Sequence, residues 1–175
     1  MYDEVRQLAI PTAKDAKYMR YLELDTTDRH LLMLLQQDAR LPNKQLAAEL
    51  GIAQSTCSAR MRRLELIGAI SGYHASVEPR ALGVGLHAMV RVTLVRHTNE
   101  EIERFWEHIE SVPEVVNTFH MTGDTDFLVQ VAVRDSNHLQ DLATTTITSW
   151  PEVGRIRTAI IFGSRQRHSL PDLSG

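Results

Sequence analysis

The sequence predicts an α+β fold with two domains, an N-terminal helix-turn-helix of the winged type and a C-terminal ferredoxin-like domain of order βαββαβ. Between residues 24 and 66, apolar residues recur at helical spacing in three short segments, separated by a proline and a glycine. From Leu86 onward, strand-like alternation and helical spacing follow one another in the ferredoxin-like order. We expect an N-terminal extension at 1–23, the helix-turn-helix domain at 24–72, a linker strand and hinge at 73–85, the ferredoxin-like domain at 86–166 and a C-terminal tail at 167–175.

The composition is that of a globular protein. Of the 175 residues, 43% are hydrophobic, which is enough for packed cores. The single cysteine, Cys57, excludes an internal disulfide framework and a thiolate metal cluster. No apolar run of about 18 residues is present to span a bilayer, and the N-terminus lacks the apolar core of a secretory signal. We therefore expect a cytoplasmic protein with no membrane partner.

Charge is unevenly distributed along the chain. A net charge of -3 argues against a nonspecific nucleic-acid binder, because such proteins usually carry a basic excess. Residues 25–80 nevertheless contain seven Lys or Arg against six Asp or Glu, whereas residues 86–165 contain seven Arg against eleven acids. The first half can therefore still present a compact basic face.

The first helix of this domain is predicted to begin with Asp25 as its N-cap and with Asp28 at the positive end of the helix dipole. Its buried face is predicted from three leucines at helical spacing: Leu31, Leu34 and Leu35. Upstream, Ala13–Leu22 is either a short helix or part of a partly ordered tail.

A second, short helix is predicted between a cap at Asn43 and a stop at Gly51, because glycine accepts the left-handed conformation that other residues resist. Its apolar residues are Leu46, Ala47 and Leu50. Ile52 is expected to fill the core at the turn that follows.

The third helix is predicted over Gln54–Leu66, with clearly different faces. One side carries Cys57, Met61 and Leu64. A stripe roughly opposite carries Thr56, Arg60 and Arg63, and the stripe beside it carries Ser55, Ala59 and Arg62. Within this helix, no acidic residue precedes Glu65. Two helices joined by a tight turn, the second with hydroxyls near its start and arginines further along, form the pattern that major-groove reading needs. The alternative is an ordinary solvated basic helix face.

After Gly68, the β-branched and aromatic residues of Ile70–Val77 predict a strand that forms the wing and leads to the second domain. Pro79 is expected to end it, and residues 81–85 are interpreted as a hinge.

The second half is predicted to contain four strands and two helices. The strands are Leu86–Val95, Val115–Thr122, Phe127–Val133 and Val153–Phe162, and the helices are Asn99–Ser111 and Ser136–Thr148. Two helices cover one face of such a sheet, so Met89, Val95, Leu128 and similar residues on the other face need a cover. A second copy of the domain is the expected cover, which predicts a dimer.

The order of these parts resembles the Lrp/AsnC or feast/famine family of bacterial and archaeal regulators. The resemblance covers Leu24 to about Gln166 and rests on Leu24-Asp25 with Asp28, on LAAELGIAQSTCSARMRRLE followed by GAISGY, and on the turn FHMTGDTDFLV. The segment GYHA and the hinge ALG are similar to those of actinobacterial members that regulate alanine dehydrogenase. The resemblance implies a sequence-specific transcriptional regulator of amino-acid metabolism genes that binds double-stranded DNA, works at the nucleoid, and forms a homodimer that assembles to an octamer.

The resemblance also assigns site residues. The implied DNA-facing set is Gln54, Ser55, Thr56, Ser58, Ala59, Arg60, Arg62 and Arg63, with Arg60 and Arg63 the strongest candidates for base or phosphate contacts. One departure is Ala53, where many members have a serine that caps the helix. Loss of such a cap costs about 1 kcal/mol unless it is replaced, and Ser55 is the candidate to set the helix start instead.

The implied effector is an amino acid bound between dimers, with no other cofactor. The effector site maps to Met121, Thr122, Gly123, Asp124, Thr125 and Asp126. Backbone N–H groups near Gly123 can receive an α-carboxylate, and Asp124 or Asp126 can hold an α-ammonium. The alternative is a plain hairpin turn whose aspartates bond their own backbone.

Other site classes have little support. The eight histidines show no ligand-pair spacing such as HxxxH, and no nucleophile elbow accompanies the serines. We therefore predict no metal site and no catalytic residues. Two alternatives stay open: an enzyme similar to the sirohaem decarboxylases, which need histidines and basic residues around a large pocket, and a DNA-compacting architectural protein with little sequence preference.

Overall fold

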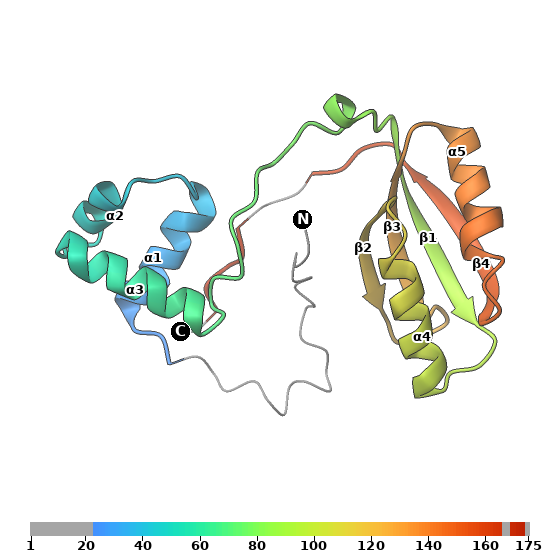
Figure 1. Cartoon of the computed structure of the whole chain (residues 1–175), viewed down its shortest axis with the longest axis horizontal. Coiled ribbons are helices and arrows are strands. Elements are labelled where there is room, and N and C mark those ends of the chain that lie inside the picture. Colours follow the sequence, from blue (N-terminus) through green and yellow to red (C-terminus); the bar gives the residue numbers. More distant parts are fainter. Residues whose placement is uncertain (1–22, 166–168, 174–175) are drawn as a thin grey trace. The chain divides into compact units, whose positions relative to one another are not determined.

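The computed structural model describes residues 23–165 and 169–173, which form two compact units (Figure 1). The described residues up to Ala75, together with 169–173, form unit 1, and Ser76–Arg165 form unit 2. The helix considered for Ala13–Leu22 lies outside the described residues. In the described ranges no helix combines the length and apolar character that crossing a membrane requires.

Unit 1 contains the helix-turn-helix predicted from the sequence, in three helices. They are α1 (Thr26–Gln37), α2 (Asn43–Glu49) and α3 (Gln54–Leu66). The N-cap at Asp25 is confirmed, and it is a full capping box: Asp28 N–H donates to Asp25 Oδ1 at 2.7 Å and Asp25 N–H donates to Asp28 Oδ2 at 3.3 Å. The helices enclose a core of fully buried side chains that includes Leu31, Leu46, Cys57 and Leu64.

The turn between α2 and α3 differs from expectation in two capping details. Asn43 was predicted to cap α2, but the N-cap is Pro42, and the Asn43 amide instead donates to the Gln54 carbonyl at 3.0 Å. Asn43 therefore fastens the start of α2 to the start of α3. The idea that Ser55 sets the start of α3 is wrong, because Ala53 is the N-cap and has no side-chain hydrogen bond. Gly51 ends α2 with a positive φ of 65°, as predicted.

The predicted wing strand over Ile70–Val77 is wrong. Residues 71–78 have no regular secondary structure, and unit 1 contains no strand among its described residues. A strand needs a neighbour for its N–H and C=O groups, and β-branched composition alone does not supply one. Instead, the Tyr73 hydroxyl donates to Glu65 of α3 at 3.0 Å. A 3-10 turn, η2 (Pro79–Leu82), follows and ends at Gly83, whose φ is 77°.

The C-terminal residues return to unit 1, which the sequence did not indicate. Leu170 N–H donates to Gln36 Oε1 at 2.6 Å, and Asp172 lies 3.8 Å from Arg29 Nε. Both partners belong to α1. The segment 169–173 therefore packs beside the first helix of the helix-turn-helix.

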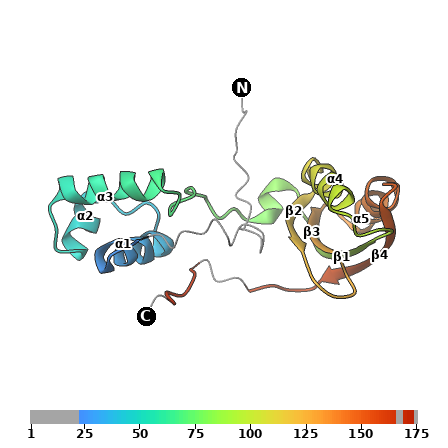
Figure 2. The ribbon, with the colours of Figure 1, turned by 90° about the horizontal axis from the view of Figure 1, so that it is seen from below.

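Unit 2 has the predicted βαββαβ order. Its elements are β1 (Leu86–Leu94), α4 (Asn99–Glu110), β2 (Val115–His120), β3 (Phe127–Val133), α5 (Ser136–Asp141), η3 (Leu142–Ile147) and β4 (Val153–Ile161). The strands form one antiparallel sheet of order β2-β3-β1-β4. Figure 2 shows α4 and α5 on the same side of this sheet. The ferredoxin-like fold class is thereby confirmed.

The core of unit 2 lies between the sheet and its helices. Every second residue of β1 and β3 is buried there, namely Ala88, Val90, Val92, Leu94, Phe127, Val129, Val131 and Val133. Phe127 contacts Phe105 and Trp106 of α4, with ring centroids 4.6 and 5.3 Å apart. The opposite face carries no helix, and Met89 and Leu128 are only half-buried on it.

The last helix is not a regular α-helix as predicted. After Asp141 it continues as the π-helical segment η3. Threonine hydroxyls here bond to backbone carbonyls, for example Thr145 Oγ1 to Asp141 O at 2.6 Å, and this competes with regular helix bonding. The Thr146 carbonyl lies 3.2 Å from His108 Nε2, and the His108 ring stacks on Trp150 at 3.9 Å.

Candidate DNA-binding and effector sites

Helix α3 carries all eight residues predicted to face DNA. Six are exposed, namely Gln54, Ser55, Thr56, Ala59, Arg62 and Arg63, while Ser58 and Arg60 are half-buried. The first acid along the helix is Glu65. The N-terminal half of α3 therefore offers short polar side chains without negative charge, which suits entry into the major groove.

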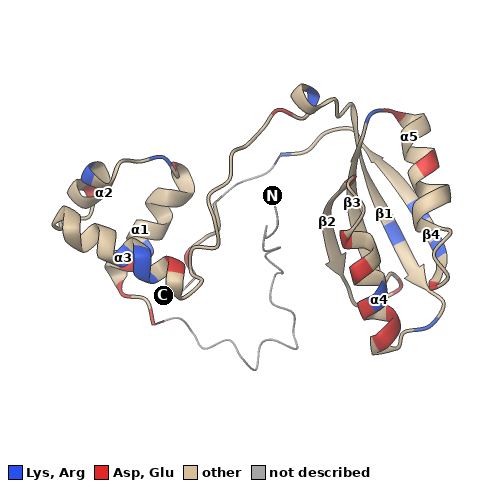
Figure 3. Ribbon diagram, in the orientation of Figure 1, with Lys and Arg blue, Asp and Glu red and all other residues tan. Residues whose placement is uncertain are grey.

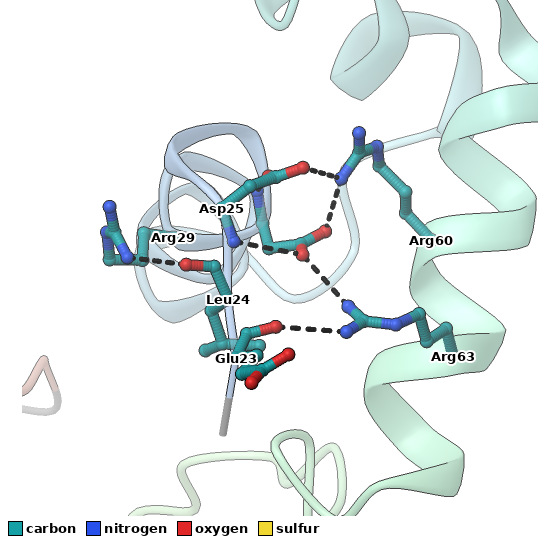
Figure 4. Close-up of polar contacts among 7 residues, drawn as sticks. Glu23, Leu24, Asp25, Arg29, Arg60 and Arg63 are labelled. Carbon is teal, nitrogen blue, oxygen red and sulfur yellow. Dashed lines mark hydrogen bonds and ion pairs between the residues drawn. The ribbon is translucent and has the colours of Figure 1, made fainter. Parts of the chain in front are cut away.

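Two of the three arginines on α3 are occupied within unit 1. Arg60 Nη1 donates to Asp25 Oδ2 and to Asp28 Oδ1, each at 2.7 Å. Arg63 Nη1 donates to Asp28 Oδ2 at 2.9 Å, and Arg63 Nη2 donates to the Glu23 carbonyl at 3.0 Å. Figure 4 shows both guanidinium groups pointing at the start of α1. We call Asp25, Asp28, Arg60 and Arg63 the clamp.

Burial and charge explain why the clamp holds. Asp28 is 2% exposed, and a carboxylate so buried needs opposite charge and hydrogen bonds to remain ionised. The pKa of Asp25 is lowered from its ordinary value by the Asp28 N–H and then by Arg60. Hydrogen bonds to Asp25 and Asp28 raise the pKa of Arg60. The clamp thus holds α3 in position against the start of α1.

The sequence did not predict the clamp, because helical spacing assigns residues to a face but does not show which residues that face contacts. Arg60 and Arg63 lie away from Cys57 and Leu64, as predicted, yet they meet carboxylates more than 30 positions earlier in the chain. The available signal in the sequence was the pair of aspartates at the start of α1, Asp25 and Asp28; the burial of Asp28 is seen only in the structure. Arg62 differs from both: it is exposed, and it makes no hydrogen bond or ion pair with another described residue. Figure 3 shows the basic positions on α3 in blue.

The clamp predicts how unit 1 responds to acid. A carboxyl group whose folded pKa lies below 3.8 contributes stability that is fully present above its unfolded pKa and is lost as the pH falls through the folded value. Asp25→Asn keeps an N-cap acceptor but removes the charge. We expect the urea midpoint of unit 1 to fall less steeply below about pH 4 in Asp25→Asn than in the wild type. Equal slopes would contradict this assignment.

The six predicted effector residues form the turn between β2 and β3. Met121 N–H donates to the Asp126 carbonyl at 2.8 Å, and Gly123 has a φ of 117°, so this position requires glycine. Asp126 does not offer a free carboxylate, because Leu94 N–H donates to its Oδ2 and His97 Nδ1 lies 2.8 Å from its Oδ1. The exposed Asp124 also has a side-chain contact, because Thr125 Oγ1 donates to its Oδ1 at 3.5 Å.

A very small hollow of about 10 Å³, room for about one water molecule, adjoins this turn at β1 and β4. Its lining residues are Arg91, Thr93, Asp124, Thr125, Arg155, Ile156 and Arg157. We call it the β1–β4 hollow. Sequence reasoning missed its three arginines because they come from strands about 60 residues apart, and only the strand register brings them together. Elsewhere, the described residues contain no group of three or more His, Cys, Asp or Glu able to hold a metal ion.

Comparison with known proteins assigns a family to each unit. Residues 24–65 match the AsnC-type helix-turn-helix domain, and residues 87–170 match the Lrp/AsnC ligand binding domain. The chain is 37% identical over 153 residues to the HTH-type transcriptional regulator AldR of Mycolicibacterium smegmatis, covering 87% of this chain and 90% of that protein. It is 32% identical over 147 residues to the leucine-responsive regulatory protein of Escherichia coli K12, covering 84% and 90%.

Solved structures show the same similarity. A transcriptional regulator of Neisseria meningitidis, crystallised as an L-Met complex, superposes with a TM-score of 0.80 at 30% identity, covering 86% of this chain and 98% of that one. The crystal structure of an AldR protein superposes with a TM-score of 0.74 at 34% identity, covering 87% and 100%.

Proposed function

We propose, starting from the fact that this chain belongs to the Lrp/AsnC family of transcriptional regulators, that it controls genes of amino-acid metabolism by sequence-specific binding to double-stranded DNA. Amino-acid modulation agrees with its ligand-binding domain. The observation that carries the proposal is α3, an acid-free helix surface up to Glu65 in a domain that matches the family's helix-turn-helix. The sirohaem-decarboxylase alternative gains no support from the relatives above, which are transcriptional regulators.

The eight residues of α3 divide into two roles in this proposal. Arg62 and the short side chains from Gln54 to Ala59 contact base edges and phosphates. Arg60 and Arg63 keep α3 in position through the clamp, and they turn only their remaining donors toward the DNA. Two arginines held by carboxylates are pre-organised, which lowers the entropy lost on binding.

The effector in this proposal is an amino acid at the turn 121–126, as suggested by the L-Met complex of the Neisseria regulator and by the leucine-responsive relative. An effector bound between dimers changes DNA binding only through its different affinity for two arrangements of the subunits. The helix-free sheet face, with Met89 and Leu128 half-buried and Phe119 exposed, supports a homodimer, and we propose that dimers assemble further to an octamer. The protein would act in the cytoplasm, on the nucleoid.

Arg62→Ala tests the DNA-binding role. The full-length protein is used to enrich a DNA fragment from a random library, and its affinity for that fragment is then compared with that of the variant. Loss of one arginine contact should weaken binding about tenfold or more, since such a contact contributes about 1–3 kcal/mol and tenfold corresponds to about 1.4 kcal/mol. Arg134→Ala, which removes an exposed arginine from unit 2, is the matched control and should bind normally.

Three results would count against the proposal. Undiminished binding by Arg62→Ala would remove this residue from the interface. Failure to enrich any sequence would favour the architectural alternative, in which the affinity for enriched and random DNA is equal and falls equally with salt. Bound haem in the purified protein would favour the enzyme alternative.

A further inference from the structure

We propose that Asp25 and Asp28 are specificity-determining residues, which withhold the charge of Arg60 and Arg63 from the phosphates that every DNA sequence offers. The inference rests on the proposed function, and it gives the start of α1 a role in DNA discrimination. All eight residues predicted to face DNA belong to α3, so this role adds two residues from a different helix.

The carboxylates of the clamp share an open cleft with the predicted DNA-facing side of α3. This cleft has a volume of about 410 Å³, and we call it the α1–α3 cleft. Its lining comprises the four clamp residues together with Glu23, Thr56 and Ala59. Figure 4 shows Asp25 and Arg60 pointing toward each other across it. A DNA strand that contacts Thr56 and Ala59 therefore also lies close to carboxylates.

The charge of the α1–α3 cleft differs from that of an ordinary DNA-binding surface. Three acidic and two basic side chains line it, so negative charge exceeds positive charge. The affinity of a protein for random DNA comes mainly from Lys and Arg side chains that neutralise phosphates. On α3, only Arg62 has no acidic partner among the described residues. Random DNA therefore meets little uncompensated positive charge at this helix.

The hydrogen bonds of the clamp limit what Arg60 can offer to DNA. Its Nη1 donates to both Asp25 Oδ2 and Asp28 Oδ1 at 2.7 Å, which occupies both hydrogens of this nitrogen. Its Nε is buried and has no hydrogen-bond partner within the described part of the chain. A bidentate contact with a phosphate or with guanine needs two donor nitrogens. Arg60 can therefore make such a contact only by leaving the carboxylates.

The carboxylates act differently on random and on specific DNA. On random DNA they only repel phosphates and compete with them for Arg60 and Arg63. In a specific complex α3 must occupy one position in the groove, and the clamp holds α3 against the start of α1 before DNA arrives. Pre-organisation lowers the entropy lost on binding, which offsets the repulsion there. A repulsive element of this kind raises the difference between two affinities, which is what specificity is.

The test uses Asp25→Asn in the full-length protein, because asparagine keeps an N-cap acceptor and removes the charge. Affinity is measured for the enriched DNA fragment and for a random fragment of the same length, each over a range of salt concentrations. Asp38→Asn is the matched control, since it changes the net charge equally, at an exposed acid beyond the other end of α1. Circular dichroism at 222 nm verifies that each variant is folded. Asp25→Ser, with another favoured N-cap residue, should reproduce the result.

We expect Asp25→Asn to bind random DNA about five- to tenfold more tightly at about 0.1 M salt, the gain from one additional phosphate contact. The slope of log affinity against log salt should become steeper by about 0.9. The affinity for the enriched fragment should change by a smaller factor, so that the ratio of the two affinities falls at least about threefold. Asp38→Asn should match the wild type in all three measurements.

The outcomes separate this inference from the proposed function. If the wild type binds enriched and random DNA equally, the proposed function fails and the inference fails with it. If Asp25→Asn matches the wild type on both fragments, sequence-specific binding stands and the inference is overturned. The same holds if Asp38→Asn tightens random binding as much as Asp25→Asn, because net charge then explains the effect. Loss of affinity for the enriched fragment alone would show that Asp25 only supports α3 or contacts a base, which also overturns the inference.

Discussion

Asp28→Ala is expected to unfold unit 1 under mild conditions and to abolish DNA binding, because Asp28 is only 2% exposed and is the ion-pair partner of both Arg60 and Arg63. Its carboxylate holds both Arg60 and Arg63 and closes the capping box of α1. Removing one partner of a buried ion pair costs ~3–5 kcal/mol, and we expect about 2–3 kcal/mol here, because both arginines are partly exposed to water. For a small domain this is a large part of the total stability.

The measurement is urea unfolding followed by circular dichroism at 222 nm, together with binding to the enriched DNA fragment. Asp38→Ala is the matched control, because Asp38 follows the other end of α1, is exposed, and its carboxylate accepts only from the nearby Arg40 N–H among the described residues. It should change neither stability nor DNA binding. If Asp28→Ala retains wild-type stability and DNA affinity, the clamp does not position α3.

Phe127→Ala is expected to destabilise unit 2 by about 3–5 kcal/mol, the usual cost of emptying a phenylalanine site in a core. Phe127 is fully buried, and its ring lies 4.6 Å from that of Phe105 and 4.9 Å from that of His120. It directly follows Asp126, the residue that ties the effector turn to the end of β1. The variant should therefore lose its amino-acid response at temperatures at which the wild type keeps it.

Differential scanning calorimetry of the full-length protein measures this effect, since a loss of this size should lower the melting transition of unit 2 by several degrees or more. Phe162→Ala removes the same side chain where it is 98% exposed, just after β4, and should leave that transition unchanged. A loss below about 1 kcal/mol in Phe127→Ala would show that the core relaxes into the space.

The sequence predicted those features that depend on neighbours along the chain. The N-cap at Asp25, the glycine stop at Gly51 and the bounds of α3 follow from local patterns, and the structure has all three. Alternation placed β1 and β3 correctly because both strands are covered by helices on one face only. The prediction of a wing strand was wrong because Ile70–Val77 has the composition of a strand but has no partner strand among the described residues of unit 1.

The parts of the site that sequence reasoning missed depend on long-range pairing. Helical spacing could put Arg60 and Arg63 on one stripe but could not show that α1 presents two carboxylates to them. The alternation of side chains along β1 and β4 could suggest that Arg91 and Arg157 lie on the same face of the sheet, but only the strand register shows that they are directly opposite. Likewise, the carboxylate of Asp126 could bind an ammonium group as far as the sequence shows. Its contacts with the Leu94 N–H and with His97 are seen only in the folded chain.

The two tryptophans of the chain, Trp106 and Trp150, both belong to unit 2. Intrinsic tryptophan fluorescence therefore reports on the ligand-binding unit alone, whereas the helical dichroism signal comes from both units. A chain of two units need not unfold in one step. An unfolding curve measured by tryptophan emission therefore does not detect the unfolding of the helix-turn-helix in unit 1. The difference between the two optical signals isolates the unfolding of the helix-turn-helix without separating it from the rest of the protein.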